Sequence, residues 1–450
     1  MPSKNVKKTT DKKDDKHVKV KKAPELKLRR PKGMRDIRDM DFFKYQGFFE
    51  HAAEIALYYG FAPIETPTVE HEDVFKSGIG AETDVVTKEM YTVKSSGRSS
   101  FALRPEGTAG VVRAYVENGW HTLPQPIKVY YFGSFFRHDR PQRGRHREFK
   151  QFGLEVLGSE KSISDAMIIT IVCKILEEAD CKDVVVHINS LGDMDSRVAY
   201  TKALTAYYKK HINKLPDDAR ETVQTNPLRL LDSKVPEIID LNKEAPEPIG
   251  SLTAPSKQHF KEVLEYLETL GIEYVVSPRL VRGLDYYRHT VFEIFETKEE
   301  GDTEPPLAIA GGGRYDGLAE QLGSKRPIPA VGAAIGVDRV LLSCEGTSLI
   351  PRILREPKVF FIHLGFEAKL HSLKITEILR KAGVPIQHSL SKDSLGAQLS
   401  GAEKSNIPYA IILGQKEVME KTVIVRNMKK HSQEVVAVDD LLAYAKKKLR

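Results

Sequence analysis

The sequence predicts an α+β protein in which an antiparallel sheet carries a helical insertion and is followed by a separate small α/β domain. Three observations support this prediction. Strand-like segments follow one another in pairs between residues 90 and 157, which favours antiparallel pairing over a doubly wound parallel sheet. Helical patterns alternate with polar loops over roughly residues 190–257. From Lys358 onward, strand and helix patterns alternate as in an α/β unit.

The composition bounds the class of protein. A chain of 450 residues is too long for one ordinary core, so two or three domains are expected. Hydrophobic residues make up 41% of it, and no apolar run approaches the roughly 20 residues that span a bilayer, so we expect a soluble protein without a membrane partner. Cys173, Cys181 and Cys344 form no CxxC pair, which argues against disulfides and favours the cytoplasm.

Positive charge is concentrated at the two ends of the chain. Residues 1–35 hold 14 Lys and Arg against 4 Asp and Glu, and residues 358–450 hold 16 against 9, although the whole chain is only +7. The body between them is therefore acidic, and this segregation is typical of an enzyme that binds a polyanion. Two solvated basic surfaces are the alternative. Residues 1–28 are Lys-rich and expected to be disordered, and their aspartates argue against a mitochondrial presequence.

The first elements are read from periodicity. Residues 39–60 predict an amphipathic helix that ends at Gly60 and turns one apolar face inward, made of Phe49, Ala52, Ala53, Ala56 and Leu57. The extended run 61–70 contains two prolines, so it should lie at a sheet edge or be distorted. The later predicted strands occupy residues 90–93, 100–104, 127–137, 146–158, 275–287, 290–295, 306–317 and 330–336, with helices at 160–180 and opening at Tyr315 and Val337.

The strand pair around residues 131–157 gathers the most informative polar side chains. Because side chains alternate faces along a strand, Phe149, Gln151 and Glu155 project together, and Arg137 ends the partner strand beside them. The connecting loop adds three further arginines, Arg140, Arg143 and Arg145. Guanidinium groups at this density suit phosphates, which they can grip through two oxygens. Solvated loop arginines are the alternative, but they do not explain an inward-facing Gln and Glu.

Four further segments carry candidate residues. LRPEGT contains Glu106 and Thr108 directly after a strand. LVRGLDYY places Arg282 near Asp285, which could also form a purely structural ion pair. AGGGRYDG matches neither the phosphate-loop nor the dinucleotide-binding pattern. AAIGVDRVLL puts Arg339 in the first turn of a helix, where a surface arginine is the alternative. No HExxH, GxSxG or metal-ligand histidine spacing occurs, so no protein-bound metal is predicted.

Taken in this order, the segments resemble the three signature motifs of class II aminoacyl-tRNA synthetases. FAPIETPTVE resembles the first motif, FRHDRPQRGRHREFKQFGLE the second and AAIGVDRVLL the third, while RGLDYY and GGGRYDG resemble the histidyl-tRNA synthetase family. The resemblance covers about residues 30–450. The arginine-rich second-motif loop is similar to bacterial-type enzymes, and the basic N-terminal tail departs from their short start.

The resemblance implies roles for the candidate residues. Arg137 would bind the ATP α-phosphate and the histidine carboxylate, with Arg282 opposite it as the second catalytic arginine. Arg145 and Arg339 would bind the outer phosphates and Phe149 would stack under adenine, with Mg²⁺ bridging the ATP phosphates. The histidine-binding residues would be Glu106, Thr108 and Gln151 at the α-amino group, Glu155 and Tyr287 at the imidazole, and Tyr286 and Tyr315 lining the pocket. Arg140, Gln142 and Arg143 would contact tRNA.

The resemblance also implies an assembly and a domain plan. The partners would be ATP, L-histidine, tRNA(His) and a second copy in a homodimer formed through the helix at 42–59 and the first motif. The expected plan is a basic tail (1–28), the catalytic domain in two parts (29–189 and 258–344) around the helical insertion (190–257), a linker (345–357) and an anticodon-binding domain (358–450). The rival readings are a catalytically silent paralogue that regulates histidine biosynthesis and an RNA-binding protein without activity.

Overall fold

A computed structural model describes residues 28–94, 100–181, 183–297, 307–344 and 349–449. The expected disorder of residues 1–28 therefore lies outside the described residues, apart from Leu28, and so does the segment 95–99 between two of the predicted strands. The described chain forms two compact units. One contains residues 59–174 and 183–343 with the segment 28–37, and the other contains residues 38–58, 175–181, 344 and 349–449. Each unit is considered by itself.

An eight-stranded sheet forms the centre of the first unit, with the order β1-β5-β6-β11-β10-β9-β7-β8. Its pairings are antiparallel except β1 with β5 and β7 with β8, so the predicted antiparallel class is confirmed. The strands are β1 (Ala62–Pro63), β5 (Ile127–Phe136), β6 (Glu148–Leu157), β7 (Val184–Ser190), β8 (Tyr274–Val276), β9 (Arg288–Glu296), β10 (Ala308–Arg314) and β11 (Ala330–Gly336). The proline-containing strand β1 lies at the edge, as expected, because proline cannot donate to a ladder.

A second, three-stranded sheet in this unit has the order β2-β4-β3. It joins β2 (Val69–His71), β3 (Thr92–Lys94) and β4 (Ser100–Leu103). The helices that accompany the two sheets are α2 (Glu72–Ile79), η1 (Val85–Glu89), α3 (Thr108–Glu117), η2 (Trp120–Thr122), α4 (Ser162–Glu178), α8 (Ala254–Thr269), α9 (Leu318–Gln321) and α10 (Val337–Ser343). The helix expected to open at Tyr315 begins at Leu318, because Tyr315 itself turns into the core.

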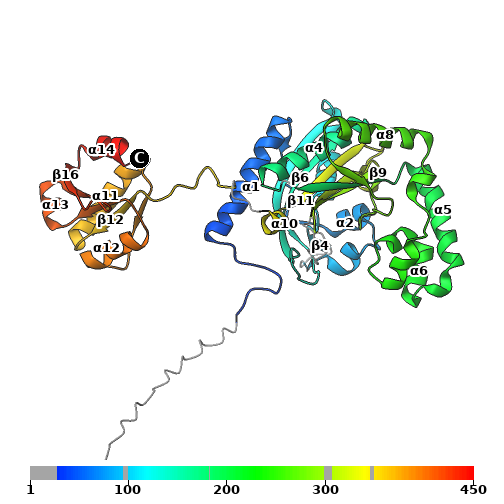
Figure 1. The fold of residues 1–450 in the computed structure, drawn as a ribbon, viewed down its shortest axis with the longest axis horizontal. Coiled ribbons are helices and arrows are strands. Elements are labelled where there is room, and N and C mark those ends of the chain that lie inside the picture. The colour runs from blue at the N-terminus through cyan, green and yellow to red at the C-terminus, as the bar shows by residue number, and fades with distance from the viewer. Residues whose placement is uncertain (1–27, 95–99, 182, 298–306, 345–348, 450) are drawn as a thin grey trace, which may run out of the picture. The chain divides into compact units, whose positions relative to one another are not determined.

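The helical insertion has its own small core. It contains α5 (Met194–Lys210), η3 (Ile212–Lys214), α6 (Asp217–Thr225), η4 (Pro227–Asp232), α7 (Pro236–Asn242) and η5 (Pro248–Ser251). Its buried side chains, among them Tyr200, Leu204, Tyr208 and Ile238, pack on one another, and α5 and α6 lie next to each other outside the sheet (Figure 1). Thr253 then caps α8 by accepting a hydrogen bond from the Ser256 amide.

The second unit holds a five-stranded sheet with the order β13-β12-β14-β15-β16. Its elements are β12 (Val359–His363), α11 (Phe366–Lys381), β13 (Ile386–His388), α12 (Leu395–Lys404), β14 (Tyr409–Leu413), α13 (Gln415–Glu420), β15 (Thr422–Asn427), β16 (Gln433–Ala437) and α14 (Leu441–Lys448). Strands β13, β12 and β14 are parallel, as expected from their alternation with helices. The antiparallel pair β15 and β16 was not predicted.

Three expectations need correction. The strand predicted over residues 275–287 ends at Val276, because Pro278 cannot donate to a ladder, and residues 277–287 form a loop. Helix α1 (Asp39–Tyr58) forms where predicted, but its buried stripe runs through Tyr45, Phe48, Ala52 and Ile55, and Leu57 is 55% exposed. The alanines fit both stripes, so periodicity placed the buried face of the helix about one residue too late.

The cysteine prediction was also wrong, because Cys181 and Cys344 form a disulfide with a Cα–Cα distance of 5.0 Å. The two lie 163 residues apart and follow different helices, so their spacing carried no signal.

Candidate active site

The register of β5 and β6 brings the predicted polar residues onto one face of the sheet. Phe135 pairs with Phe149, Gly133 with Gln151 and Val129 with Glu155, at positions two or more apart on each strand. Side chains on alternate residues share a face, so Phe149, Gln151 and Glu155 line the same side, as the alternation predicted. The neighbouring strand β11 places Gly332 opposite Glu155.

Glu155 is the centre of a buried network of hydroxyl groups. One of its carboxylate oxygens accepts a hydrogen bond from Thr108 Oγ1 at 2.8 Å and one from the Tyr131 hydroxyl at 3.2 Å, and the other accepts from the Tyr315 hydroxyl. The side chain has no exposed surface. Burial raises the pKa of Glu155 to about 8, although the three hydroxyls favour its ionised form. The site therefore disfavours the ionised form of this carboxyl relative to water.

This network adds contacts to the predicted pocket. The Thr108 hydroxyl, expected at the histidine α-amino group, is bonded to Glu155. Tyr287, expected at the imidazole together with Glu155, lies beside Tyr286, with ring centroids 4.6 Å apart. Tyr131 was missed, although it shares the face of Glu155 on the partner strand. Its ring occupies the space over Gly153, where a Cβ would lie 2.0 Å from it, so a glycine is required there.

Gln151 supplies an acceptor beside this network. Its Oε1 atom is buried and has no hydrogen-bond partner in the described structure. A buried acceptor left unsatisfied costs free energy, and such groups are rare in folded proteins. The position suits a donor supplied by a ligand, and an ammonium group is the donor that the predicted role of Gln151 requires.

Glu106 and Arg137 are held by backbone groups near the start of α3. The Glu106 carboxylate accepts hydrogen bonds from the amides of Thr108 at 2.7 Å and Ala109 at 2.9 Å. Burial raises its pKa. Arg137 Nε donates to the Pro105 carbonyl at 2.9 Å, and its guanidinium lies 5.7 Å from the centroid of the Phe149 ring. The strand end thus brings Arg137 next to Phe149, as predicted, and Arg137 is also bonded to the residue that precedes Glu106.

Arg282 forms an ion pair with Glu293 and not with Asp285, the partner considered from the sequence. Its Nη1 donates to Glu293 Oε1 at 2.9 Å, and its guanidinium lies 5.6 Å from the centroid of the Tyr287 ring. Asp285, the candidate structural partner, instead accepts from the Asn226 side-chain amide at 3.1 and 3.2 Å. A Cβ on Gly311 would lie 2.0 Å from Arg282 Nη1. This close approach explains a glycine of AGGGRYDG without any phosphate loop.

The four predicted phosphate-binding arginines influence one another electrostatically. Burial, followed by the charges of Arg145 and Arg137, lowers the pKa of Arg339 to about 10. Burial also lowers the pKa of Arg137, and the charge of Arg282 adds to that effect. The alternative that Arg339 is an ordinary surface arginine is wrong, since it is largely buried and its Nε donates to the Gly144 carbonyl at 3.1 Å. Such a concentration of positive charge favours a polyanionic ligand.

The three predicted tRNA-contacting residues lie on the loop between β5 and β6. Arg140, Gln142 and Arg143 are all exposed. Arg145, in the same loop, forms an ion pair of 3.0 Å with Asp139, and the backbones of Gln142 and Arg145 form an isolated bridge. The loop therefore has an internal fold that directs Arg145 toward Arg339 and leaves the other three side chains at the surface.

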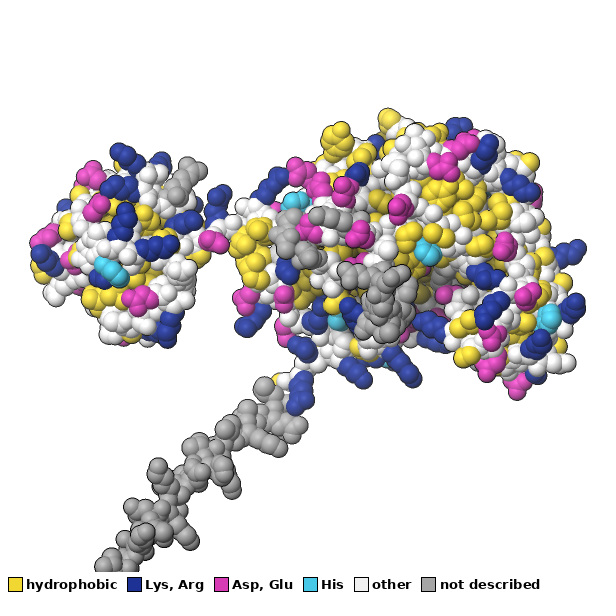
Figure 2. Space-filling view, in the orientation of Figure 1, with side chains coloured by type: hydrophobic (Ala, Val, Ile, Leu, Met, Phe, Trp, Pro, Cys, Tyr) yellow, Lys and Arg dark blue, Asp and Glu magenta, His cyan; other side chains and the backbone are white. Residues whose placement is uncertain are grey.

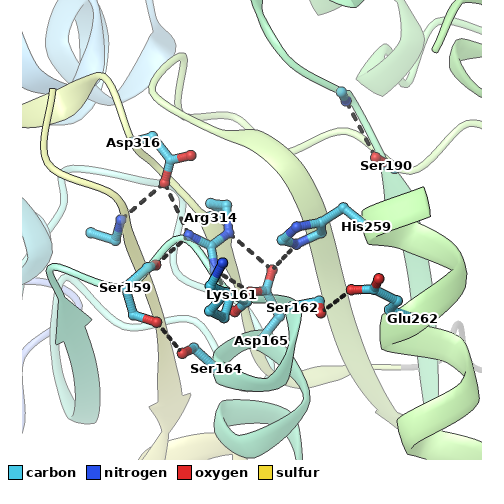
Figure 3. A network of polar contacts seen from close by, with 12 residues as sticks. Ser159, Lys161, Ser162, Ser164, Asp165, Ser190, His259, Glu262, Arg314 and Asp316 are labelled. Atoms are coloured by element: carbon cyan, nitrogen blue, oxygen red, sulfur yellow. Dashed lines mark hydrogen bonds and ion pairs between the residues drawn. The ribbon is translucent and has the colours of Figure 1, made fainter. Parts of the chain in front are cut away.

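A second buried network surrounds Arg314 (Figure 3). Arg314, at the end of β10, is 1% exposed and forms an ion pair with Asp165 of α4, and its Nη1 lies 3.2 Å from Asp316 Oδ1. His259 Nε2 lies 3.3 Å from Asp165 Oδ1. Burial would raise the pKa of Asp165, but the charge of Arg314 and both hydrogen bonds hold it at about 2. No role was predicted for Arg314, although its neighbour Tyr315 points into the Glu155 network.

Comparisons with known proteins agree with this geometry. The family model described as histidyl-tRNA synthetase matches residues 33–340, and the one described as anticodon binding domain matches residues 358–448. The histidine--tRNA ligase of Fervidobacterium nodosum is 41% identical over 404 residues, which cover 89% of this chain and 94% of the relative. That of Desulforamulus reducens is 38% identical over 417 residues, which cover 93% and 98%.

One solved structure extends the likeness to the fold. The crystal structure of apo histidyl-tRNA synthetase from S. aureus has a TM-score of 0.76 and 31% identity, and the match covers 93% of this chain and 100% of that one. The antiparallel sheet, the cluster of arginines and the C-terminal anticodon-binding domain define a class II aminoacyl-tRNA synthetase. Such an enzyme is an aminoacyl-tRNA ligase. Within that class, the chain belongs to the histidyl-tRNA synthetase family.

Proposed function

We propose that this chain activates L-histidine with ATP to form histidyl-adenylate and transfers the histidyl group to the 3′ end of tRNA(His), releasing AMP and diphosphate. The observation that carries this proposal is the fully buried Glu155, surrounded by hydroxyl groups on the sheet face that also holds Arg137. A buried carboxyl with hydroxyl neighbours suits a small polar ring, and the arginines beside it suit ATP.

The amino-acid pocket would read both ends of histidine. Glu155 would accept the imidazole N–H, with Tyr131 and Tyr315 fixing its carboxylate and Tyr287 facing the other edge of the ring. The buried Gln151 Oε1 would accept from the α-ammonium group, and Glu106 would supply the opposite charge. Thr108 would then serve by orienting Glu155, a change from the role first expected of it. Tyr286 would close the pocket, since it is 2% exposed and its hydroxyl lies 3.5 Å from Glu106 Oε2.

The arginines would stabilise adenylate formation. A histidine carboxylate oxygen attacks the α-phosphorus of ATP, and the bond from that phosphorus to the bridging oxygen breaks as diphosphate leaves. Negative charge grows on the non-bridging oxygens, where Arg137 and Arg282 would act as preorganised donors. Arg145 and Arg339 would hold the outer phosphates, and Phe149 would stack under adenine, next to the guanidinium of Arg137.

A divalent metal accompanies ATP in class II synthetases, and we propose Mg²⁺. Bound to the phosphates, it would neutralise part of their charge. Among the described residues, no three His, Cys, Asp or Glu side chains converge into a metal site. The arginines fit the phosphates of the nucleotide, and the metal would be held by those phosphates.

The tRNA would be bound at two places. Arg140, Gln142 and Arg143, exposed on the β5–β6 loop, would contact the acceptor end, and the domain at 358–450 would bind the anticodon. Figure 2 supports a dispersed contact with phosphates, because Lys and Arg side chains are spread over the visible face of the C-terminal domain, with Asp and Glu between them. The remaining parts of the plan are the catalytic domain (29–189 and 258–344), the insertion (190–257) and the linker (345–357).

A homodimer located in the cytoplasm completes the proposal. Helix α1 exposes Met40, Phe42, Leu57 and Tyr58, which suits burial against a second copy. Over the described part of the chain, no helix is long and apolar enough to cross a bilayer.

ATP–diphosphate exchange with each of the twenty amino acids tests the proposed function. Exchange should depend on histidine alone, and Glu155→Ala should weaken the use of histidine far more than that of ATP, because the ring nitrogen loses its partner. Equal exchange with glutamine or asparagine would contradict the assignment. A null result with all twenty would favour the silent paralogue or the RNA-binding protein.

A further inference from the structure

The loop between β8 and β9 carries Arg282, Tyr286 and Tyr287 but contains no helix or strand of its own. Tyr286 and Tyr287 are nevertheless buried, so contacts from other segments must fix them. Asn189 of β7 donates to the carbonyls of Pro278 and Leu280, at 3.2 and 3.1 Å, and thereby holds the first part of the loop. The second part is held from the helical insertion.

Arg197 lies in the first turns of α5, the first helix of the insertion. Its Nη1 donates to the carbonyls of Asp285 and Tyr287, both at 3.1 Å, and so spans Tyr286. Arg288 Nη1 donates to the same two carbonyls at 3.3 and 2.9 Å. Two partly buried cations so close together repel each other, and burial followed by the charge of Arg197 lowers the pKa of Arg288 to about 10. Arg197 therefore adds a second clamp despite an electrostatic cost.

Asn226 provides an independent contact from another part of the insertion. It follows α6, and its side-chain amide donates to both carboxylate oxygens of Asp285. On the opposite side, the Asp285 amide donates to the Ile79 carbonyl at 2.9 Å, at the end of α2. The residue that precedes Tyr286 is thus held between the insertion and α2.

The base of α5 is itself fixed, which gives Arg197 a defined position. Asp193 caps the helix by accepting from the Ser196 amide at 2.8 Å, and it also accepts from the hydroxyl of Thr253, the cap of α8. The Asp193 amide donates to Ser256 Oγ at 3.0 Å. These bonds join the entry and exit of the insertion, so Arg197 is carried by a rigid base.

We propose that Arg197 and Asn226 are positioning residues, through which the helical insertion sets the geometry of the loop bearing Arg282, Tyr286 and Tyr287. The proposal rests on the proposed function for its catalytic meaning, but the clamp itself is a property of the fold. Because a misplacement of about 1 Å in a catalytic group can cost on the order of 100-fold in rate, the insertion would control activation of the amino acid without touching it.

Two variants and a matched control separate this role from general stability. Arg197→Met keeps the length of the side chain but removes its donors, and Asn226→Asp replaces a donor with a like charge facing Asp285. Arg220→Met removes an exposed arginine of α6 that pairs with Asp217 at 2.8 Å within the insertion. In exchange assays, each of the first two should lower kcat/KM for histidine about 10- to 100-fold while KM for ATP changes less than about twofold, and the control should match the parent chain.

Amide hydrogen exchange provides a readout that does not depend on activity. Arg197→Met and Asn226→Asp should speed exchange in peptides covering residues 279–290, and Arg220→Met should not. Unchanged hydrogen exchange in those peptides overturns the proposal, as does a KM for ATP that rises as much as kcat/KM for histidine falls. If the parent chain fails to exchange diphosphate with histidine but the loop still loosens, the proposed function is wrong and the clamp stands.

Discussion

At the scale of single residues, the site holds buried ionisable side chains whose charges are only partly balanced by neighbouring groups of opposite charge. Glu155 is held among hydroxyls rather than cations, so burial dominates its protonation. Arg137, Arg282 and Arg339 bond to carbonyls or to one carboxylate, and their mutual repulsion persists. The proposed substrates would supply the missing partners, because histidine brings a ring N–H to Glu155 and ATP brings a polyphosphate to the arginines.

The pKa of Glu155 predicts a pH dependence of stability. The ordinary value is 4.5 and the folded value about 8, so between these values the folded protein retains a proton that the unfolded chain has lost. The free energy of unfolding should therefore fall as the pH rises from 4.5 to 8, by up to about 1.4 kcal/mol per unit from this group. Glu155→Gln should remove that slope in urea denaturation, and Glu265→Gln, an exposed carboxylate on α8, is the control. Parallel slopes for the parent chain and Glu155→Gln would contradict the prediction.

Arg282 tests the proposed transition-state role. Arg282→Ala should slow adenylate formation by on the order of 10²–10³, the typical loss for a preorganised donor. Lysine should not restore it, because a compact ammonium cannot keep the planar fork. Transfer from preformed adenylate to tRNA breaks a bond at the carboxyl carbon and should change less. Rapid quench separates the half-reactions, and adenylate formation near the parent rate would leave Arg282 as only the partner of Glu293.

At the scale of elements, the site depends on how β10 is attached to its neighbours. Arg314 at the end of β10 is tied to α4 through Asp165, and Tyr315 follows it directly into the Glu155 network. Gly311, on the same strand, leaves room for Arg282. One strand therefore sets the positions of two site residues that lie on different segments.

The buried ion pair predicts a large loss of stability when one partner is removed. Arg314→Met leaves Asp165 buried without its cation, which should lower the free energy of unfolding by about 3–5 kcal/mol. Arg220→Met, which breaks an exposed pair, should cost less than about 1 kcal/mol. Because Asp165 has a folded pKa of about 2, its contribution should also be lost as the pH falls from about 4 to 2. Denaturation curves that coincide for the two variants would show that the pair is dispensable.

At the scale of the whole molecule, two basic segments lie at opposite ends of the chain. Deleting residues 1–28 should weaken tRNA binding uniformly and flatten its dependence on salt, because fewer counterions are released. Deleting residues 358–450 should in addition abolish discrimination between anticodons. Histidine-dependent exchange should survive removal of the tail. Filter binding over a range of salt concentrations measures both effects, and an unchanged slope without the tail would assign the tail another purpose.

The sequence alone determined the class of sheet, the separate C-terminal α/β domain and the face that unites Phe149, Gln151 and Glu155, because these follow from local periodicity and from side-chain alternation along a strand. Only the tertiary structure decided the partners. Tyr131 bonds Glu155, Glu293 rather than Asp285 pairs with Arg282, and Cys181 meets Cys344. Each of these contacts joins residues far apart along the chain, or depends on the space left by a glycine such as Gly153, and neither distance nor space is encoded in local spacing.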